Sequence, residues 1–242
     1  MVFFVVQLQD EFYRITLVHL EPKFMSMLDE YTPKLLALFH SKGGAMGLKL
    51  QAIIAKSPSN PSNNITRNLV IQCLMVYLGE SIDQLIKEYS VSVEVETLFC
   101  FCYSYVFVKF QIISGIIMFY LSFSYRMCAT TVRKPMCLLF QDADEDGVSQ
   151  DLSEQRMKIY KIKAVGSEED DIGIVLEGVR VMPALGNFPR ACAMLVGLTY
   201  AVDLAYPKEL KYTLEVFQKL FLELDCAKLS PKVNSLKNKL LA

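Results

Sequence analysis

Residues 171–182, DIGIVLEGVRVM, precede residues 190–206, RACAMLVGLTYAVDLAY, and the change of pattern between these two stretches decides the fold class. In the first stretch apolar and polar residues alternate, as they do in a half-buried β-strand. The second stretch is apolar on nearly every side, as in a helix enclosed by other elements. RMKIYKIKA (156–164) also alternates, and a polar turn-like segment separates it from 171–182. The sequence therefore predicts one antiparallel hairpin near 156–182 and a buried helix at 190–205.

Helical patterns on both sides of this region predict an α+β chain that is mostly helical. Residues 208–225 carry an apolar stripe at helical spacing, which we expect to cover the 190–205 helix. Lys208, Glu215 and Lys219 lie off this stripe and are expected to face water. The other segments with helical patterning are 22–56, where Pro22 and Pro33 can each open a helical turn, 64–79, which Gly79 can cap, 81–89, with Ser81 as the expected N-cap, and 230–242.

A long apolar segment interrupts the chain at 98–125, where Lys109 is the one charged residue. Its length is sufficient for a transmembrane helix. The basic residues that follow it would place the carboxyl-terminal side in the cytoplasm. Against this interpretation, a lysine near the centre of a span costs about 3 kcal/mol on insertion scales. The segment therefore predicts either a transmembrane-like helix or an insertion that does not belong to the native fold.

The composition of the same region supports the insertion hypothesis. Phe, Tyr, Ser, Cys and Ile dominate it, as in a translation of thymine-rich DNA. Val91-Ser92 can be encoded by a splice-donor consensus, and CLLFQ (137–141) by a pyrimidine tract that ends in a splice acceptor. Removal of 91–141 would join LIKEYS to DADEDG in frame. We interpret 91–141 as a retained intron or gene-model error; a mature transcript found only in the long form would contradict this.

These patterns divide the chain into four regions. They are a helical amino region (1–90), the apolar insertion (91–141), an acidic linker (142–155) and a region with the hairpin and helices (156–242).

The acidic linker begins like a calcium-binding loop. Asp142, Asp144 and Asp146 stand at the first, third and fifth positions of such a loop, followed by a glycine at the sixth. The twelfth position, which should supply a bidentate glutamate, is Ser153. Loss of that ligand favours a solvated acidic linker over a metal site, so no metal or other cofactor is expected.

Other motifs give little material for catalysis. His19 and His40 are far apart in sequence, with no nucleophile beside either. The chain has seven cysteines, an odd and sparse set that favours reduced thiols in an intracellular protein over a disulfide framework. SKGGAMG (41–47) lacks the spacing of a phosphate-binding loop and is expected to form a turn. A net charge of −1 gives no field that would attract nucleic acid, and no nucleic-acid partner is expected.

The lysines near the carboxyl end have a simple interpretation. They are expected to be the solvated face of an amphipathic helix rather than a phosphate-binding patch. They are Lys228, Lys232, Lys237 and Lys239.

Long stretches of the chain resemble a known group of proteins. DEFYRITLVHLEPKFMSMLDEYTPKLLALFHSKGGAMGLKL, NLVIQCLMVYLGE, the region 171–225 and SPKVNSLKNKLL are similar to the carboxyl-terminal region of fish proteins labelled sterile alpha motif domain-containing protein three-like. The resemblance covers about 10–90 and 142–242 and omits the apolar segment. It implies no catalytic residue and no cofactor, but fuller members of the group carry a protein-association domain.

The expected function follows from these observations. We expect a non-enzymatic, intracellular protein-interaction module, in the cytoplasm or nucleus, whose protein partner and oligomeric state the sequence does not specify. The alternative hypothesis is a single-pass membrane protein that spans the bilayer at about 98–125.

Overall fold

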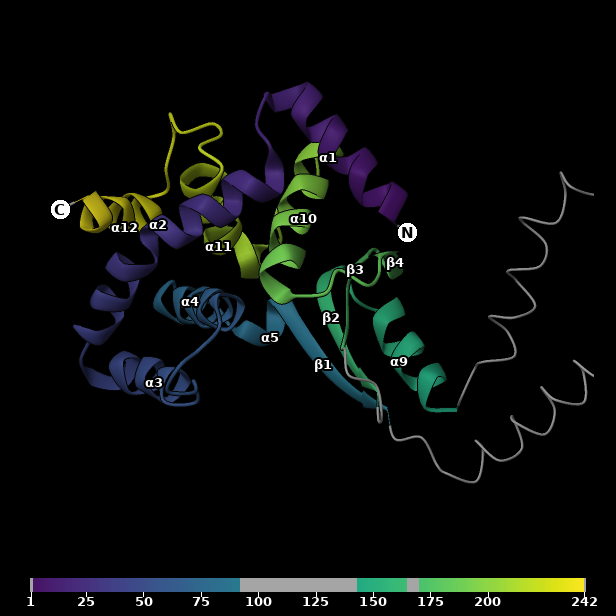
Figure 1. The fold of residues 1–242 in the computed structure, drawn as a ribbon, viewed down its shortest axis with the longest axis horizontal. Coiled ribbons are helices and arrows are strands. Elements are labelled where there is room, and N and C mark those ends of the chain that lie inside the picture. Colours follow the sequence, from purple (N-terminus) through teal and green to yellow (C-terminus); the bar gives the residue numbers. More distant parts are fainter. Residues whose placement is uncertain (1, 92–142, 165–169, 242) are drawn as a thin grey trace, which may run out of the picture.

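The computed structural model describes residues 2–91, 143–164 and 170–241, and confirms an α+β fold that is mostly helical (Figure 1). The strands are β1 (Ile86–Val91), β2 (Met157–Ala164), β3 (Asp171–Leu176) and β4 (Val179–Met182). The α-helices are α1 (Val2–Thr16), α2 (Leu20–His40), α3 (Gly44–Ile54), α4 (Asn63–Tyr77), α5 (Ile82–Leu85), α9 (Ala143–Ser153), α10 (Phe188–Ala201), α11 (Lys211–Val216) and α12 (Pro231–Leu241). A 3₁₀ turn, η1 (Lys208–Leu210), precedes α11, and a π-helical segment, η2 (Phe217–Phe221), follows it.

The predicted hairpin is present, but its second strand is shorter than expected. Strands β2 and β3 pair in antiparallel register, with Tyr160 opposite Gly173. The predicted strand 171–182 is interrupted at Glu177 and Gly178, which have φ angles of 47° and 75°. The chain turns there and returns as β4, which pairs antiparallel with β3. The hairpin is therefore part of a sheet with the order β1-β2-β3-β4.

Strand β1 corrects the prediction of a helix over 81–89. Helix α5 is a single turn, and the side chain of Ser81 makes no capping hydrogen bond to it. The chain then becomes extended and pairs parallel to β2, with Ile86 opposite Ile159. Both of these isoleucines are buried in the core. Burial in a sheet outweighs the helical propensity of so short a segment, because a single helical turn is marginal alone.

Helix α9 corrects the prediction of an acidic linker over 142–155. Val148 and Leu152, four residues apart and therefore on one side of the helix, are buried against the sheet. They form a small hydrophobic cluster with Tyr160, Ile162 and Val175. The acidic segment is thus a helix whose buried apolar residues cover one face of the sheet.

Strand β1, helix α9 and strand β2 together form a crossover between parallel strands. Nζ of Lys87 in β1 lies 2.7 and 2.8 Å from the two carboxylate oxygens of Asp151 in α9, and the Tyr89 hydroxyl also donates to Asp151. These contacts hold α9 against β1. Figure 1 shows that β1 ends and α9 begins at the same edge of the sheet. A parallel connection needs about a dozen residues or more. The fifteen residues 142–156 meet this requirement without 91–141.

Helix α10 is the most buried helix of the carboxyl-terminal half, as predicted. Eleven of its fourteen residues are buried. It contacts α1, α2 and α4 on its helical side and β2 and β3 on its other side, so it lies at the centre of the fold (Figure 1). Gly197 permits this close packing, because a Cβ atom there would lie 2.2 Å from Cδ2 of Leu20.

The predicted helix over 208–225 is formed by η1, α11 and η2 and ends at Phe221, and its apolar stripe is buried as far as that residue. Phe217 and Phe221 pack edge-to-face on Phe24 of α2, with ring centroids 5.2 and 5.4 Å apart. The expectation that Lys208 faces water is confirmed. The same expectation is wrong for Glu215, which is buried and accepts the N–H of Ser230 just before α12. It is also wrong for Lys219, whose side chain is only 17% exposed and lies beside Glu215.

The end of α4 and the start of α11 are each capped by a residue distant in sequence. The Glu80 carboxylate accepts the N–H groups of Tyr212, at 2.7 Å, and Thr213, at 3.0 Å, in the first turn of α11. Lys232 donates to the carbonyl oxygen of Leu78 at the end of α4, at 2.8 Å. Gly79, with φ of 71°, ends α4 as predicted. Opposite charges thus complement both helix dipoles.

The amino-terminal helices differ from prediction at one proline. Pro33 lies inside α2 and opens no new helix. Leu28 and Leu35, on either side of it, are fully buried. Their burial keeps the helix continuous despite the hydrogen bond that a proline cannot donate.

The segment 98–125 lies outside the described residues. Within the described ranges, no helix combines the length and the apolar character that a bilayer crossing requires. The transmembrane and insertion hypotheses both remain predictions.

Deletion of 91–141, which joins Ser90 to Asp142, should leave a folded protein. The residues 142–156 suffice to connect β1 to β2, and a shorter connection has less closure entropy to lose on folding. Urea unfolding followed by circular dichroism should show one cooperative transition and no loss of stability. Loss of the cooperative transition would contradict both the complete crossover and the insertion hypothesis.

Replacement of Glu80→Ala should lower the free energy of unfolding by about 1–3 kcal/mol, because two backbone donors at the start of α11 lose their acceptor. Glu80→Gln retains one acceptor oxygen and should lose less. Glu11→Ala, which removes an exposed ion pair with Arg14, is the matched control and should change stability by less than about 0.5 kcal/mol. Equal losses of unfolding free energy in Glu80→Ala and Glu11→Ala would show that the Glu80 cap does not stabilise α11.

Candidate functional site

The calcium-loop residues do not form such a loop in the part that the structure describes. Asp142 lies outside the described residues. Asp144 and Asp146 fall within α9, where the backbone is helical rather than wound around an ion. Among the described residues, no group of three His, Cys, Asp or Glu side chains could hold a metal ion.

The two histidines have separate structural positions. The His19 ring precedes α2 and stacks on Tyr13, with centroids 4.5 Å apart. His40 is exposed at the last position of α2.

The thiols of Cys73 and Cys192 are buried, and burial raises the pKa of Cys73 to about 12. A buried thiol with a raised pKa is a poor nucleophile at neutral pH.

The turn expected over SKGGAMG is confined to its first residues, 41–43, because Gly44–Gly47 already belong to α3. Gly43 precedes α3 and Gly44 has φ of 67°.

The lysines of the carboxyl end are less uniform than predicted. Lys232 caps α4, and Lys239 donates to the Tyr77 hydroxyl at 3.0 Å, whereas Lys228 is exposed. Two of the four lysines therefore stabilise the fold through hydrogen bonds, instead of only forming the solvated face of a helix.

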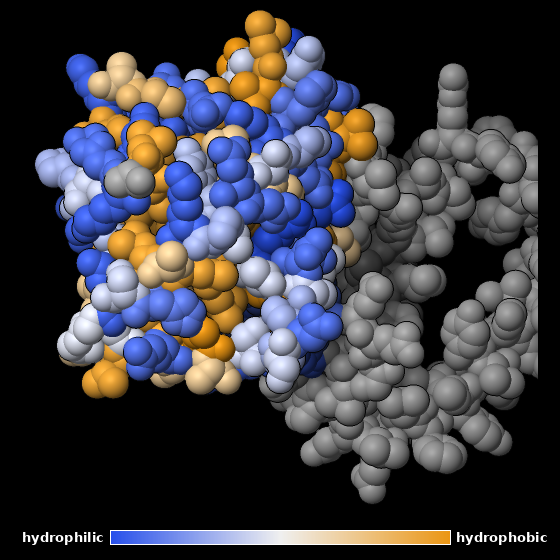
Figure 2. Space-filling model, turned by 60° about the vertical axis from the view of Figure 1, so that its left-hand side comes forward, coloured by the Kyte–Doolittle hydropathy of each residue, from blue (hydrophilic) through white to orange (hydrophobic). Residues whose placement is uncertain are grey.

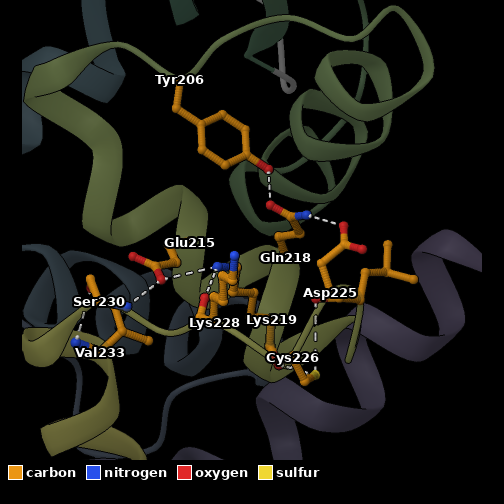
Figure 3. Close-up of polar contacts among 10 residues, drawn as sticks. Tyr206, Glu215, Gln218, Lys219, Asp225, Cys226, Lys228, Ser230 and Val233 are labelled. Carbon is orange, nitrogen blue, oxygen red and sulfur yellow. Dashed lines mark hydrogen bonds and ion pairs between the residues drawn. The ribbon is translucent and has the colours of Figure 1, made fainter.

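A polar network surrounds the loop between η2 and α12 (Figure 3). The Tyr206 hydroxyl donates to Oε1 of Gln218 at 2.7 Å, and Nε2 of Gln218 donates to Asp225 at 2.8 Å. Burial and the nearby Asp225 carboxylate raise the pKa of Tyr206, so the phenol remains a neutral donor. Cys226, which is exposed, donates to the carbonyl oxygen of Lys219. These groups hold the loop in place.

Glu215 lies at the other end of this network (Figure 3). Its Oε1 accepts the N–H of Ser230 at 2.8 Å and lies 3.3 Å from Nζ of Lys219. Ser230 in turn accepts the N–H of Val233 in the first turn of α12. Burial alone would raise the pKa of Glu215, but the bonds from Ser230 and Lys219 outweigh it and hold the pKa below its usual value. The buried carboxylate is therefore ionised and structural.

The first surface that remains open is a groove beside α3. It has a volume of about 500 Å³. We name it the α3 groove; its lining residues are Ala45, Met46, Lys49, Val76, Gly79, Glu80, Ser81, Ile82 and Asp83. Helix α3 is mostly apolar, yet only Gly47 and Leu50 are buried in it. Leu48 is 70% exposed and Met46 is 38% exposed.

Apolar exposure extends beyond single residues on this side of the molecule. Figure 2 shows the face that carries the left-hand elements of Figure 1, where hydrophobic side chains gather below the centre among hydrophilic ones. Contiguous exposed apolar surface is a mark of interaction sites, whereas isolated apolar residues are not. The α3 groove is therefore our first candidate binding surface.

The second open surface is a cleft of about 520 Å³ between the end of α9, the start of β2 and the loop before η1. We name it the basic cleft; its lining residues are Gln84, Gln155, Arg156, Met157, Lys158 and the run Ala205–Leu210. Arg156, Lys158 and Lys208 are its cations and Glu209 is its single carboxylate. This balance favours an anionic over a cationic ligand.

Comparisons with known proteins add no assignment to these surfaces: no protein-family model, curated protein or solved structure matches the chain significantly.

Sequence reasoning missed both open surfaces. The apolar residues of α3 are visible in GLKLQAIIAK, but their lack of cover depends on the position of α4. The residues that line the basic cleft come from three segments distant in sequence, so no local motif predicts the cleft. A usable signal was present only for Lys158, which occupies a polar position in an alternating strand.

Replacement of Glu215→Gln should flatten the acid limb of the stability profile. A carboxylate whose pKa is lowered by folding contributes stability above its unfolded pKa, and this contribution is lost as the pH falls through the folded pKa. Wild type should lose stability below the ordinary value of about 4.5, and Glu215→Gln should lose less over the same range. Urea unfolding between pH 7 and pH 3 measures both curves. Glu209→Gln, at an exposed position, should follow wild type, and parallel curves for all three proteins would contradict the prediction.

Proposed function

We propose that the chain is a non-enzymatic, intracellular protein-interaction module that binds an amphipathic helix of another protein in the α3 groove. The observation that carries this proposal is the exposure of Met46, which lines this groove on a helix that is mostly apolar. The resemblance to proteins whose fuller members carry a protein-association domain points in the same direction.

The groove has the shape and chemistry for such a partner. An amphipathic helix inserts apolar residues into a groove between helices at spacings of three and four. Met46, Val76 and Ile82 provide an apolar lining, and the flexible thioether of a methionine adapts to different partner side chains. Lys49 and Asp83, which also line the groove, can pair with a carboxylate and an amine of the partner. These charges would fix the direction in which the helix binds.

The proposed intracellular location is supported by the cysteines. Cys73 and Cys192 are buried and unpaired, and Cys226 is exposed and unpaired among the described residues. Free thiols are typical of a reducing compartment.

Photo-crosslinking tests the proposal directly. A photo-reactive amino acid at Lys49, which lines the groove, introduced into the full chain in cells, should give a discrete crosslinked product with another protein. The same amino acid at Val179, which is 60% exposed on β4, is the matched control and should not give that product. Mass spectrometry should place the crosslink in an amphipathic helix of the partner.

Substitution supplies the second arm. The Met46→Glu variant should weaken capture of that partner by tenfold or more, because burial of one large apolar side chain contributes about 1.5–3 kcal/mol. Val179→Glu should retain it. A crosslink only to a second copy of this chain, or capture that is indifferent to the groove substitution, would overturn the proposal.

A further inference from the structure

Lys158 differs from the other lysines of β2 in its surroundings. Lys161 lies 3.0 Å from Asp170, and Lys163 lies 2.6 Å from Glu88. Lys158 has no hydrogen bond or ion pair to any described residue. The neighbouring Asp151 carboxylate is already occupied by Lys87 and a tyrosine hydroxyl.

Lys158 is half-buried and is one of the residues that line the basic cleft. Burial lowers its pKa, and the nearby ammonium of Lys87 lowers it further; Asp151 and Asp83 oppose this change but do not reverse it. An amine in such surroundings is unprotonated more often than an exposed lysine. The unprotonated amine is the form that attacks carbonyl carbon.

The rest of the cleft favours a small anion. Its volume of about 520 Å³ lies in the range of small-molecule sites. Arg156 and Lys208 can bind a carboxylate or phosphate, although Arg156 also lies 3.3 Å from Glu177 on the exposed side. Gln84 and Gln155 add amide donors and acceptors. Glu209 is the one carboxylate in the lining.

We propose that the basic cleft binds a small anionic carbonyl compound and that Lys158 holds it as a reversible imine. The ε-nitrogen adds to the carbonyl carbon and forms a new N–C bond. The carbonyl oxygen leaves as water with the two protons of the amine, and the C=N bond replaces C=O. No oxidant or reductant takes part, and addition of water reverses the step. The site is separate from the α3 groove and stands independently of the proposed function.

Reductive trapping tests the site in the full chain. Glyoxylate, an aldehyde that carries a carboxylate, is incubated with the protein near pH 7 in the presence of cyanoborohydride, which converts an imine to a stable secondary amine. Peptide mass spectrometry should find Lys158 labelled several-fold more than Lys161 or Lys163. Inorganic phosphate should compete and lower the labelling. Glycolaldehyde, which has no charge, should label Lys158 less than glyoxylate does.

Variants separate the roles of the groups. Lys158→Arg should abolish the dominant label while leaving the urea unfolding curve unchanged. Lys208→Gln should reduce labelling of Lys158, because it removes one cation that attracts the carboxylate. Lys163→Gln, on the same strand but outside the cleft, should leave it unchanged. Labelling spread over the lysines according to exposure would overturn the reactive amine, and equal labelling by the two aldehydes would overturn the anionic site.

Discussion

The enclosure of helix α10 is the constraint on which the other elements depend. A helix that is apolar on almost every side can be stable in water only when other elements cover all of its faces. Helices α1, α2 and α4 cover one side, and the sheet covers the other. The approach of Leu20 over Gly197 shows how close this packing is. Because the covering elements come from both the 1–90 and the 156–242 regions, these regions share one core.

A second layer of organisation comes from charged groups that fix helix ends. Glu80 caps α11, Glu215 supports the start of α12, and Lys232 caps the end of α4. Each contact joins segments that are distant in sequence, and each satisfies backbone groups that a helix end leaves open. These three side chains are therefore occupied by structural bonds, whereas the buried Tyr160 hydroxyl has no hydrogen-bond partner among the described residues. The exposed apolar residues of α3 and the amine of Lys158 take no part in these bonds.

The sequence was informative where a pattern is local and strong. The alternation in β2 and β3 and the apolar helix α10 could be predicted, because their periodicities depend on few assumptions. Strand β1 could not, because its parallel partner begins about seventy residues later and its own six residues are ambiguous. Among the side chains of α9 that the structure describes, Val148 and Leu152 are the buried apolar ones, too few to outweigh an acidic composition. Glu215 was expected in water because its buried partner, the Ser230 N–H, belongs to the backbone and has no sequence signature.

The parallel pairing of β1 with β2 also changes how the apolar segment is understood. Patterning alone allowed a transmembrane helix or an insertion. Neither hypothesis predicted that the residues just before and just after this segment contact each other in the fold. In the structure these residues form the two halves of a crossover, with α9 bonded to β1 through Asp151. A crossover of this kind is complete when its helix covers the sheet, and the Val148 and Leu152 cluster provides that cover. The connection therefore imposes no requirement for additional apolar residues, and the insertion hypothesis predicts that the fold forms without them.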